Sequence, residues 1–195
     1  MTFYLIRHGE TDWNRQNRLQ GIEDIELNET GIRQSAECAR ALRGVKAGRI
    51  LSSPLKRAVK TAEIISEYTG GPPVIVEEGL TERDFGRLSG ITLPEREALL
   101  ASGEDPGMEP FDVLTDRLLR VLNAYKACGG AENILLVSHG ASINALLSVL
   151  SGGELGTGQT VLKNVCISKL RCAGDSFAVE FYNLTPEEFT RLGGR

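Results

Sequence analysis

The chain has 195 residues, of which 41% are hydrophobic, and this length and composition are typical of a single well-packed globular domain. Its 26 acidic residues outnumber its 22 basic ones, so no overall positive field attracts nucleic acid or an anionic membrane surface. The four cysteines have no CxxC spacing and the chain contains only two histidines, which argues against a zinc site built from these residues.

Four short apolar runs predict strands that are buried on both faces, as in a parallel sheet. They cover Thr2–Ile6, Ile50–Leu51 with its flanks, Val74–Val76 and Ile134–Val137. None approaches the length needed to cross a bilayer, and the first lacks the basic start of a secretory signal. We therefore expect a cytoplasmic protein that contacts no membrane.

Helical patterns separate these runs and have recognisable starts and ends. Ser53 followed by Pro54 predicts an N-cap and a proline at the first helical position, and Gly70 and Gly71 end that helix. The other predicted helices extend from an N-cap at Asn28 to Arg43, from about Pro110 to Ala127, and onwards from Gly140.

The last part of the chain predicts a hairpin followed by a short helix. Segments 164–172 and 177–183 flank a turn at Ala173 to Ser176, so at least one late strand is antiparallel. A capping box at Thr185 and Glu188 starts the final helix. The order of strands and helices predicts an α/β fold, a three-layer α/β/α sandwich with a mostly parallel sheet and one late antiparallel strand.

Residues 86–109 differ from the rest of the chain because glycines and prolines interrupt a short helical stretch near Glu95 to Ala101. We interpret this segment as an insertion over the edge of the sheet that acts as a lid, within a single domain of residues 1–195.

Both histidines of the chain follow predicted strands. His8 comes directly after the first strand and His139 directly after the strand at 134–137. Ligands of open α/β sheets bind beyond the carboxyl ends of the strands, so both side chains fall at the edge where a ligand is expected. A lone histidine at a strand end is more often structural, but two of two, each followed by glycine and with arginines nearby, favour a functional site.

Two histidines, arginines and one carboxylate suit phosphoryl transfer through a phosphohistidine. A neutral imidazole attacks phosphorus, arginines bind the phosphate oxygens, and an acid protonates the leaving oxygen. Arg57 lies in the first turn of a predicted helix, where the helix dipole disfavours a cation unless it binds an anion. A glycine after each histidine allows the backbone to approach phosphate, and a helix that starts at Gly140 adds N–H donors.

Four motifs in this order resemble the histidine phosphatase superfamily, the phosphoglycerate mutase-like group. They are Arg7-His8-Gly9-Glu10-Thr11 with Trp13-Asn14, then SSPLKRAVKTAE, LTERDFGRLSG and VSHG. The resemblance extends from Phe3 to about Leu150. It is specific because each motif is weak evidence alone, whereas four in the right order are strong.

The resemblance implies a role for each residue of these motifs. His8 is the nucleophile, and Glu82 donates a proton to the leaving group and then activates the attacking water. The implied phosphate pocket consists of Arg7, Arg57 and His139, and Asn14 contacts the phosphoryl group or the substrate near it. Gly140 joins the predicted substrate-binding residues because a helix that starts there offers N–H donors. Glu10 and Ser52 are expected to orient their neighbours.

Three of these residues also have a plain structural interpretation. Arg57 could be a solvated helix residue, Glu82 could form a surface ion pair with Arg83 or Arg87, and Asn14 could be a turn or cap residue.

The predicted function is a metal-independent phosphomonoesterase, without cofactor, that hydrolyses a small phosphorylated metabolite. The alternatives are a phosphoglycerate mutase and, as the specific phosphatase activity, an α-ribazole phosphatase of cobalamin synthesis. The interval after Glu82 is short and lacks the arginine pair with which mutases bind the glycerate carboxylate, which favours a phosphatase. An inactive phosphate-binding relative is disfavoured because every expected catalytic residue is present. The sequence indicates neither the physiological substrate nor the oligomeric state.

Overall fold

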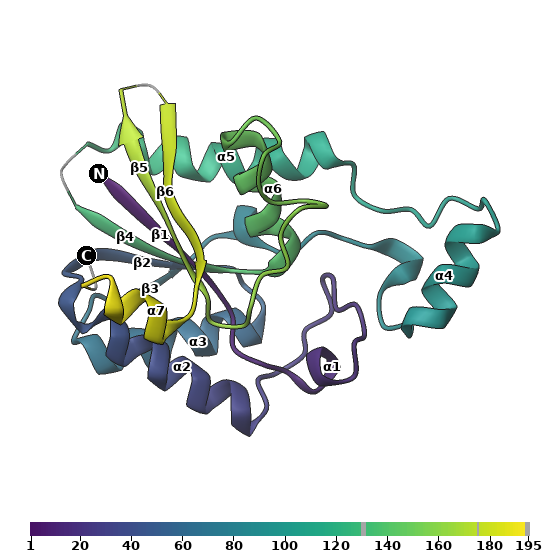
Figure 1. The fold of residues 1–195 in the computed structure, drawn as a ribbon, viewed down its shortest axis with the longest axis horizontal. Helices are drawn as coiled ribbons and strands as arrows, with labels where there is room; N and C mark the ends of the chain where they lie inside the picture. Colours follow the sequence, from purple (N-terminus) through teal and green to yellow (C-terminus); the bar gives the residue numbers. More distant parts are fainter. Residues whose placement is uncertain (130–131, 175, 194–195) are drawn as a thin grey trace.

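A computed structural model describes residues 1–129, 132–174 and 176–193, and across these residues the chain forms one six-stranded sheet covered by helices (Figure 1). The strands lie in the order β3-β2-β4-β1-β5-β6. Their bounds are β1 Thr2–Arg7, β2 Ala47–Ser52, β3 Val74–Val76, β4 Asn133–Ser138, β5 Ile167–Ala173 and β6 Ser176–Leu184. The first four strands are parallel, whereas β5 is antiparallel to both of its neighbours. This confirms the predicted sheet.

Helices cover both faces of the sheet, which confirms the three predicted layers (Figure 1). Their bounds are α1 Asp12–Arg15, α2 Glu29–Ala41, α3 Lys56–Thr69, α4 Leu93–Ala101, α5 Phe111–Ala127, α6 Gly140–Leu150 and α7 Pro186–Arg191, with short 3-10 turns at Leu42–Gly44, Glu78–Leu80 and Gly86–Leu88. Helices α2, α3 and α7 pack on one face, and α5 and α6 pack on the other. No helix among the described residues is both long enough and apolar enough to cross a membrane.

Strand β1 shows how the sheet supports the residues at its edge. Phe3 and Leu5 pack towards α5 and α6, while Tyr4 and Ile6 pack towards α2, α3 and α7. All four side chains are buried, and each contributes about 1.5–3 kcal/mol of hydrophobic stabilisation. The strand is therefore held from both faces up to Ile6, two residues before His8.

Two local predictions are wrong. Helix α3 begins at Lys56 with Leu55 as its N-cap, because the Ser53 hydroxyl accepts the Leu55 N–H at 3.3 Å within a turn that precedes the helix. Strand β3 is not buried on both faces: it is the edge strand and pairs only with β2, so Ile75 and Val76 are 40% and 49% exposed. The predicted hairpin turn includes Asp175, which lies outside the described residues.

The 86–109 segment projects from one end of the sheet and carries α4 (Figure 1). A capping box between Thr92 and Glu95 starts α4, yet none of the nine residues of this helix is buried. The segment is fastened near its ends, where the Glu109 N–H donates to Asp84 O at 2.8 Å and the Arg87 N–H donates to Pro106 O at 2.9 Å. Its function as a lid stays a prediction.

Candidate active site

The two histidines lie side by side because β1 and β4 are neighbouring parallel strands. Arg7 pairs with Ser138 in the sheet, so the next residue of each strand is a histidine. The ring centroids of His8 and His139 are 5.1 Å apart, and both rings are buried. The structure thus places both histidines at the carboxyl edge of the sheet, as expected.

The surroundings of His8 define which of its nitrogens is free to react. Its Nδ1 lies 2.6 Å from Gly9 O, and since a carbonyl oxygen only accepts, Nδ1 carries the proton and Nε2 keeps its lone pair. Burial, then the cations Arg57 and Arg7, hold the pKa of His8 well below its usual value. The ring is therefore neutral at physiological pH, the form that a nucleophile requires.

His139 is the N-cap residue of α6, and its ring contacts Ser53, which the sequence predicted to be a helix N-cap. Its Nε2 lies 2.7 Å from the Ser53 hydroxyl, while its buried Nδ1 has no partner among the described residues. Burial, followed by Arg57 and the neighbouring His8, lowers the pKa of His139 far below its usual value. Ser53, rather than Ser52, is thus the serine that orients the second histidine.

Arg57 is a fully buried cation, so the alternative of a solvated helix residue is wrong. Its exposed fraction is 0%, and its Nη1 and Nη2 donate to the carbonyl oxygens of Glu23 at 2.5 Å and Gly21 at 2.8 Å. Its buried Nε–H has no partner among the described residues. Burial lowers the pKa of Arg57 to about 10, which leaves the side chain charged at neutral pH.

Arg7 is held in a similar way to Arg57. Its Nη1 donates to Leu162 O at 2.5 Å, and its buried Nε–H has no partner among the residues that the structure describes. Burial lowers the pKa of Arg7 as well. Each guanidinium is therefore oriented by backbone carbonyls and keeps at least one N–H for another acceptor.

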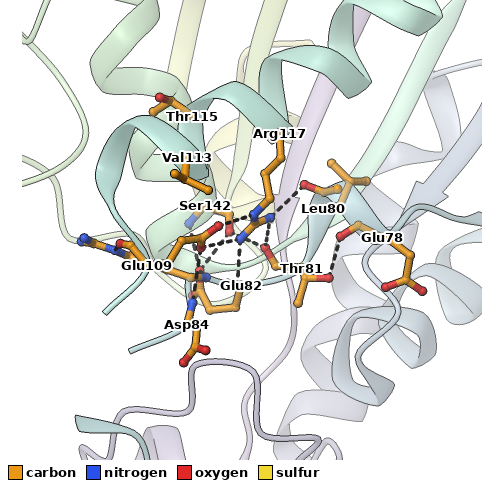
Figure 2. A network of polar contacts seen from close by, with 12 residues as sticks. Glu78, Leu80, Thr81, Glu82, Asp84, Glu109, Val113, Thr115, Arg117 and Ser142 are labelled. Carbon is orange, nitrogen blue, oxygen red and sulfur yellow. Dashed lines mark hydrogen bonds and ion pairs between the residues drawn. The ribbon is translucent and has the colours of Figure 1, made fainter. Parts of the chain in front are cut away.

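Glu82 is 8% exposed and does not form the ion pair with Arg83 or Arg87 that the alternative interpretation required. Its Oε1 accepts from the Arg83 N–H at 2.9 Å, the Ser142 N–H at 2.9 Å and the Ser142 hydroxyl at 3.0 Å (Figure 2). Its Oε2 accepts the Ala141 N–H at 3.1 Å, its one partner within the described part of the chain. The N–H groups of Ala141 and Ser142 in the first turn of α6, expected to face phosphate, are thus bonded to Glu82.

Asn14 takes part in helix capping and also lines the cavity, the two possibilities that the sequence left open. Its Oδ1 accepts the Thr11 N–H at 3.1 Å within the capping box of α1, so it is a cap residue. It also lines the cavity beside His8. Glu10 and Ser52 make local contacts instead, since Glu10 accepts from the Asn28 amide at 2.9 Å and the Ser52 hydroxyl donates to Ser53 O at 2.9 Å.

The two glycines that follow the histidines differ in what surrounds them. A Cβ on Gly9 would lie 2.5 Å from Gly31 O, so Gly9 is required for close packing against α2. A Cβ on Gly140 would make only ordinary contacts, the nearest being Arg7 Nε at 3.6 Å. Gly140 nevertheless lines the cavity.

A cavity of about 250 Å³ lies at this edge of the sheet. Among the predicted site residues it is lined by Arg7, His8, Asn14, Arg57, Glu82 and Gly140. His139 is not among the lining residues, although its ring lies beside that of His8. Within the described lining Glu82 is the single carboxylate. A second cavity of about 390 Å³ shares Arg7, Asn14 and Arg18 with the first and is also lined by Leu93 and Arg96 of α4.

Sequence reasoning missed three residues with polar side chains that line the first cavity, namely Arg18, Gln20 and Asn144. Arg18 stacks on Trp13 at 4.6 Å and its Nε donates to Gly90 O at 2.7 Å. Buried oxygens of Gln20 and Asn144 have no partner among the described residues. None of the three follows a predicted strand, so only the polar segment after the first motif could have drawn attention to Arg18 and Gln20.

Comparisons with known proteins agree with the geometry. Residues 3–185 match the model of the histidine phosphatase superfamily, branch 1. The chain is 41% identical over 180 residues to the uncharacterized phosphatase PhoE of Bacillus subtilis strain 168, covering 92% of this chain and 93% of that protein. It is 36% identical over 160 residues to the probable phosphoglycerate mutase GpmB of Cronobacter sakazakii, with 76% and 74% covered.

A solved structure is also similar. The mycobacterial glucosyl-3-phosphoglycerate phosphatase in complex with VO3 has a TM-score of 0.83 and 28% sequence identity, over 94% of this chain and 99% of that one. Within the described residues no group of three or more His, Cys, Asp or Glu side chains is arranged to hold a metal ion.

Proposed function

Because the chain belongs to the histidine phosphatase superfamily, we propose that it hydrolyses small phosphomonoesters through a phosphohistidine on His8, with arginines rather than a metal ion binding the phosphate. One observation carries the proposal. A neutral imidazole shares a cavity with two guanidinium groups, Arg7 and Arg57, whose buried Nε–H groups have no partner among the described residues. Such unpaired donors are costly unless an acceptor binds them, and phosphate oxygens are suited to do so.

In the first step His8 Nε2 attacks phosphorus in line with the leaving oxygen. The Nε–H groups of Arg7 and Arg57 bind non-bridging oxygens and stabilise their charge, and His139 assists from its place beside His8. The P–O bond to the substrate breaks as the P–N bond forms, and the leaving oxygen takes a proton from Glu82. Alcohol is released and phosphohistidine remains.

In the second step water replaces the alcohol. Glu82, now a carboxylate, accepts a proton from the water molecule while the water oxygen attacks phosphorus. The P–N bond then breaks, which returns neutral His8 and releases inorganic phosphate. The placement of Glu82 as the one carboxylate in the described cavity lining supports both of its roles.

A phosphoglycerate mutase would use the same intermediate but pass the phosphoryl group to a second hydroxyl. The short 86–109 segment and the relative of 41% identity named a phosphatase favour hydrolysis. An α-ribazole phosphatase would be one specific form of the hydrolase. A screen of phosphorylated metabolites, with inorganic phosphate and phosphoglycerate isomerisation both measured, separates these activities.

The central test is hydrolysis of p-nitrophenyl phosphate in the presence of EDTA. We expect the wild type to release phosphate, and His8→Ala to lose activity by a factor of about 10³ or more, because no other group supplies the nucleophile. Arg15→Gln, which changes an exposed residue of α1, is the control and should keep full activity. Undiminished activity of His8→Ala, or activity that EDTA removes, would contradict the proposal.

A further inference from the structure

We propose that Arg117 and Glu109 are positioning residues for Glu82: they form a clamp on the backbone around Glu82 and so hold its carboxyl group at the leaving oxygen. This proposal rests on the proposed function, in which Glu82 is the acid. Neither clamp residue lines the two cavities, so any effect on catalysis must pass through Glu82 and its neighbours.

The backbone around Glu82 needs a clamp because Glu82 does not directly follow a strand. His8 and His139 follow directly on buried strands, and Arg57 is anchored within a long helix. Glu82 comes six residues after the three-residue edge strand β3, in a segment whose only regular element is the 3-10 turn Glu78–Leu80. Hydrogen bonds from outside the segment must therefore fix its backbone.

Arg117, on α5, supplies these bonds (Figure 2). Its Nη1 donates to Gly79 O at 2.9 Å and Thr81 O at 2.7 Å, and its Nη2 donates to Glu82 O at 3.0 Å. The two remaining N–H groups bind the Glu109 carboxylate, Nε at 2.7 Å and Nη2 at 2.9 Å. All five N–H donors of the guanidinium are used. Three of them bind the backbone carbonyls of Gly79, Thr81 and Glu82 itself.

Glu109 orients the guanidinium and fixes the residues on the other side of Glu82. Its backbone O accepts from Arg83 Nε at 2.8 Å, and its backbone N–H donates to Asp84 O at 2.8 Å. The Arg117 and Glu109 side chains are 21% and 14% exposed, so their bidentate ion pair is only partly screened by solvent. The clamp thus holds the backbone before, at and after the proposed acid.

Gly79 makes this approach possible. A Cβ at this position would lie 2.5 Å from Val121 Cγ2 and 3.2 Å from Arg117 O, so the segment lies directly on α5 only because it has a glycine there. The same clamp also closes the base of the 86–109 segment, since Asp84 and Glu109 stand at its two ends.

The test compares p-nitrophenyl phosphate with phenyl phosphate, whose leaving group needs protonation more. We measure kcat/KM, which reports phosphoryl transfer to His8. Arg117→Ala should lower it about tenfold to a hundredfold for phenyl phosphate but less than about threefold for p-nitrophenyl phosphate. The inhibition constant of inorganic phosphate should stay within about twofold of wild type, because the phosphate pocket is untouched.

Three further variants and a control separate positioning from folding. Arg117→Lys and Glu109→Gln, which keep part of the clamp and are less disruptive, should show the same selectivity with a smaller loss. In a Glu82→Gln background, Arg117→Ala should add less than about twofold, since the group that it positions no longer donates a proton. Arg120→Ala, an exposed arginine on the same helix, is the control and should match wild type for both substrates.

Equal losses on both substrates, or the full effect of Arg117→Ala persisting in Glu82→Gln, would overturn the clamp and assign Arg117 a general structural role. Wild-type rates in Arg117→Ala would also overturn it while leaving the proposed function intact. Failure of the wild type to release phosphate from either substrate would overturn the proposed function itself.

Discussion

The carboxyl edge of the sheet and the 86–109 segment both contribute to the lining of the second cavity, the first through Arg7 and the second through Leu93 and Arg96, but they are built differently. At the sheet edge His8, Arg57 and His139 are buried, and each is held by a backbone carbonyl or a hydroxyl. In the segment, α4 has no buried residue, yet its Leu93 and Arg96 line the second cavity. We infer that the sheet edge carries the chemistry common to all substrates and that the segment contributes to the choice among them.

The strongest test of this comparison is Arg57→Lys. Lysine keeps the charge, but its three donors lie on one nitrogen and cannot reproduce the planar fork that bonds to Gly21 and Glu23 while a separate N–H faces phosphate. We therefore expect kcat/KM to fall by about 10²–10³ for every substrate. Arg43→Lys, at an exposed arginine far from the cavities, serves as the control. A loss below tenfold, or one confined to particular substrates, would contradict a common phosphate site at the sheet edge.

The second test is the pH dependence of stability. Burial holds the pKa values of His8 and His139 well below about 6.5, their value in the unfolded chain. Below that pH the unfolded state binds more protons than the native state, so the free energy of unfolding falls as the pH falls. Between pH 7 and pH 5 each histidine should remove up to about 2 kcal/mol.

Urea unfolding in buffers without phosphate measures this dependence. The double variant His8→Gln, His139→Gln should show a flatter pH profile than wild type between pH 7 and pH 5, whereas substitutions in α4 should leave the slope unchanged. Identical slopes in wild type and the double variant would show that these rings are not held neutral by the fold.

The smallest expected effect comes from the segment. Arg96 lines the second cavity, and no carboxylate is among the described residues that line it, so Arg96→Gln should weaken binding of a substrate with a second negative group. We expect kcat/KM to fall about threefold to tenfold for 3-phosphoglycerate and to stay unchanged for glycerol 3-phosphate, which lacks the carboxylate. Glu97→Gln, on the exposed surface of the same helix, is the control. An unchanged ratio between the two substrates would remove Arg96 from substrate choice.

Much of the fold could be predicted because its signals are local. The apolar runs mark β1, β2, β3 and β4, and Asn28, Gly70 and Thr185 cap the helices where expected. The common edge of His8 and His139 followed from one general rule about parallel strands. Apart from the start of α3, which a local turn at Ser53 displaces, the predictions that failed concern contacts between distant parts of the chain: Ser53 with His139, and the exposure of β3 at the edge of the sheet.

The sequence by itself determined which residues could carry phosphoryl chemistry and at which edge of the sheet they emerge, since both depend on residue type and on the alternation of short strands and helices. Only the tertiary structure decided how Glu82 is held. Its contacts come from Ala141 and Ser142 on α6 and, through the backbone, from Arg117 on α5, far away in the chain. Hydrogen bonds of this kind depend on how separate helices pack on one sheet, and no local pattern of residues encodes that arrangement.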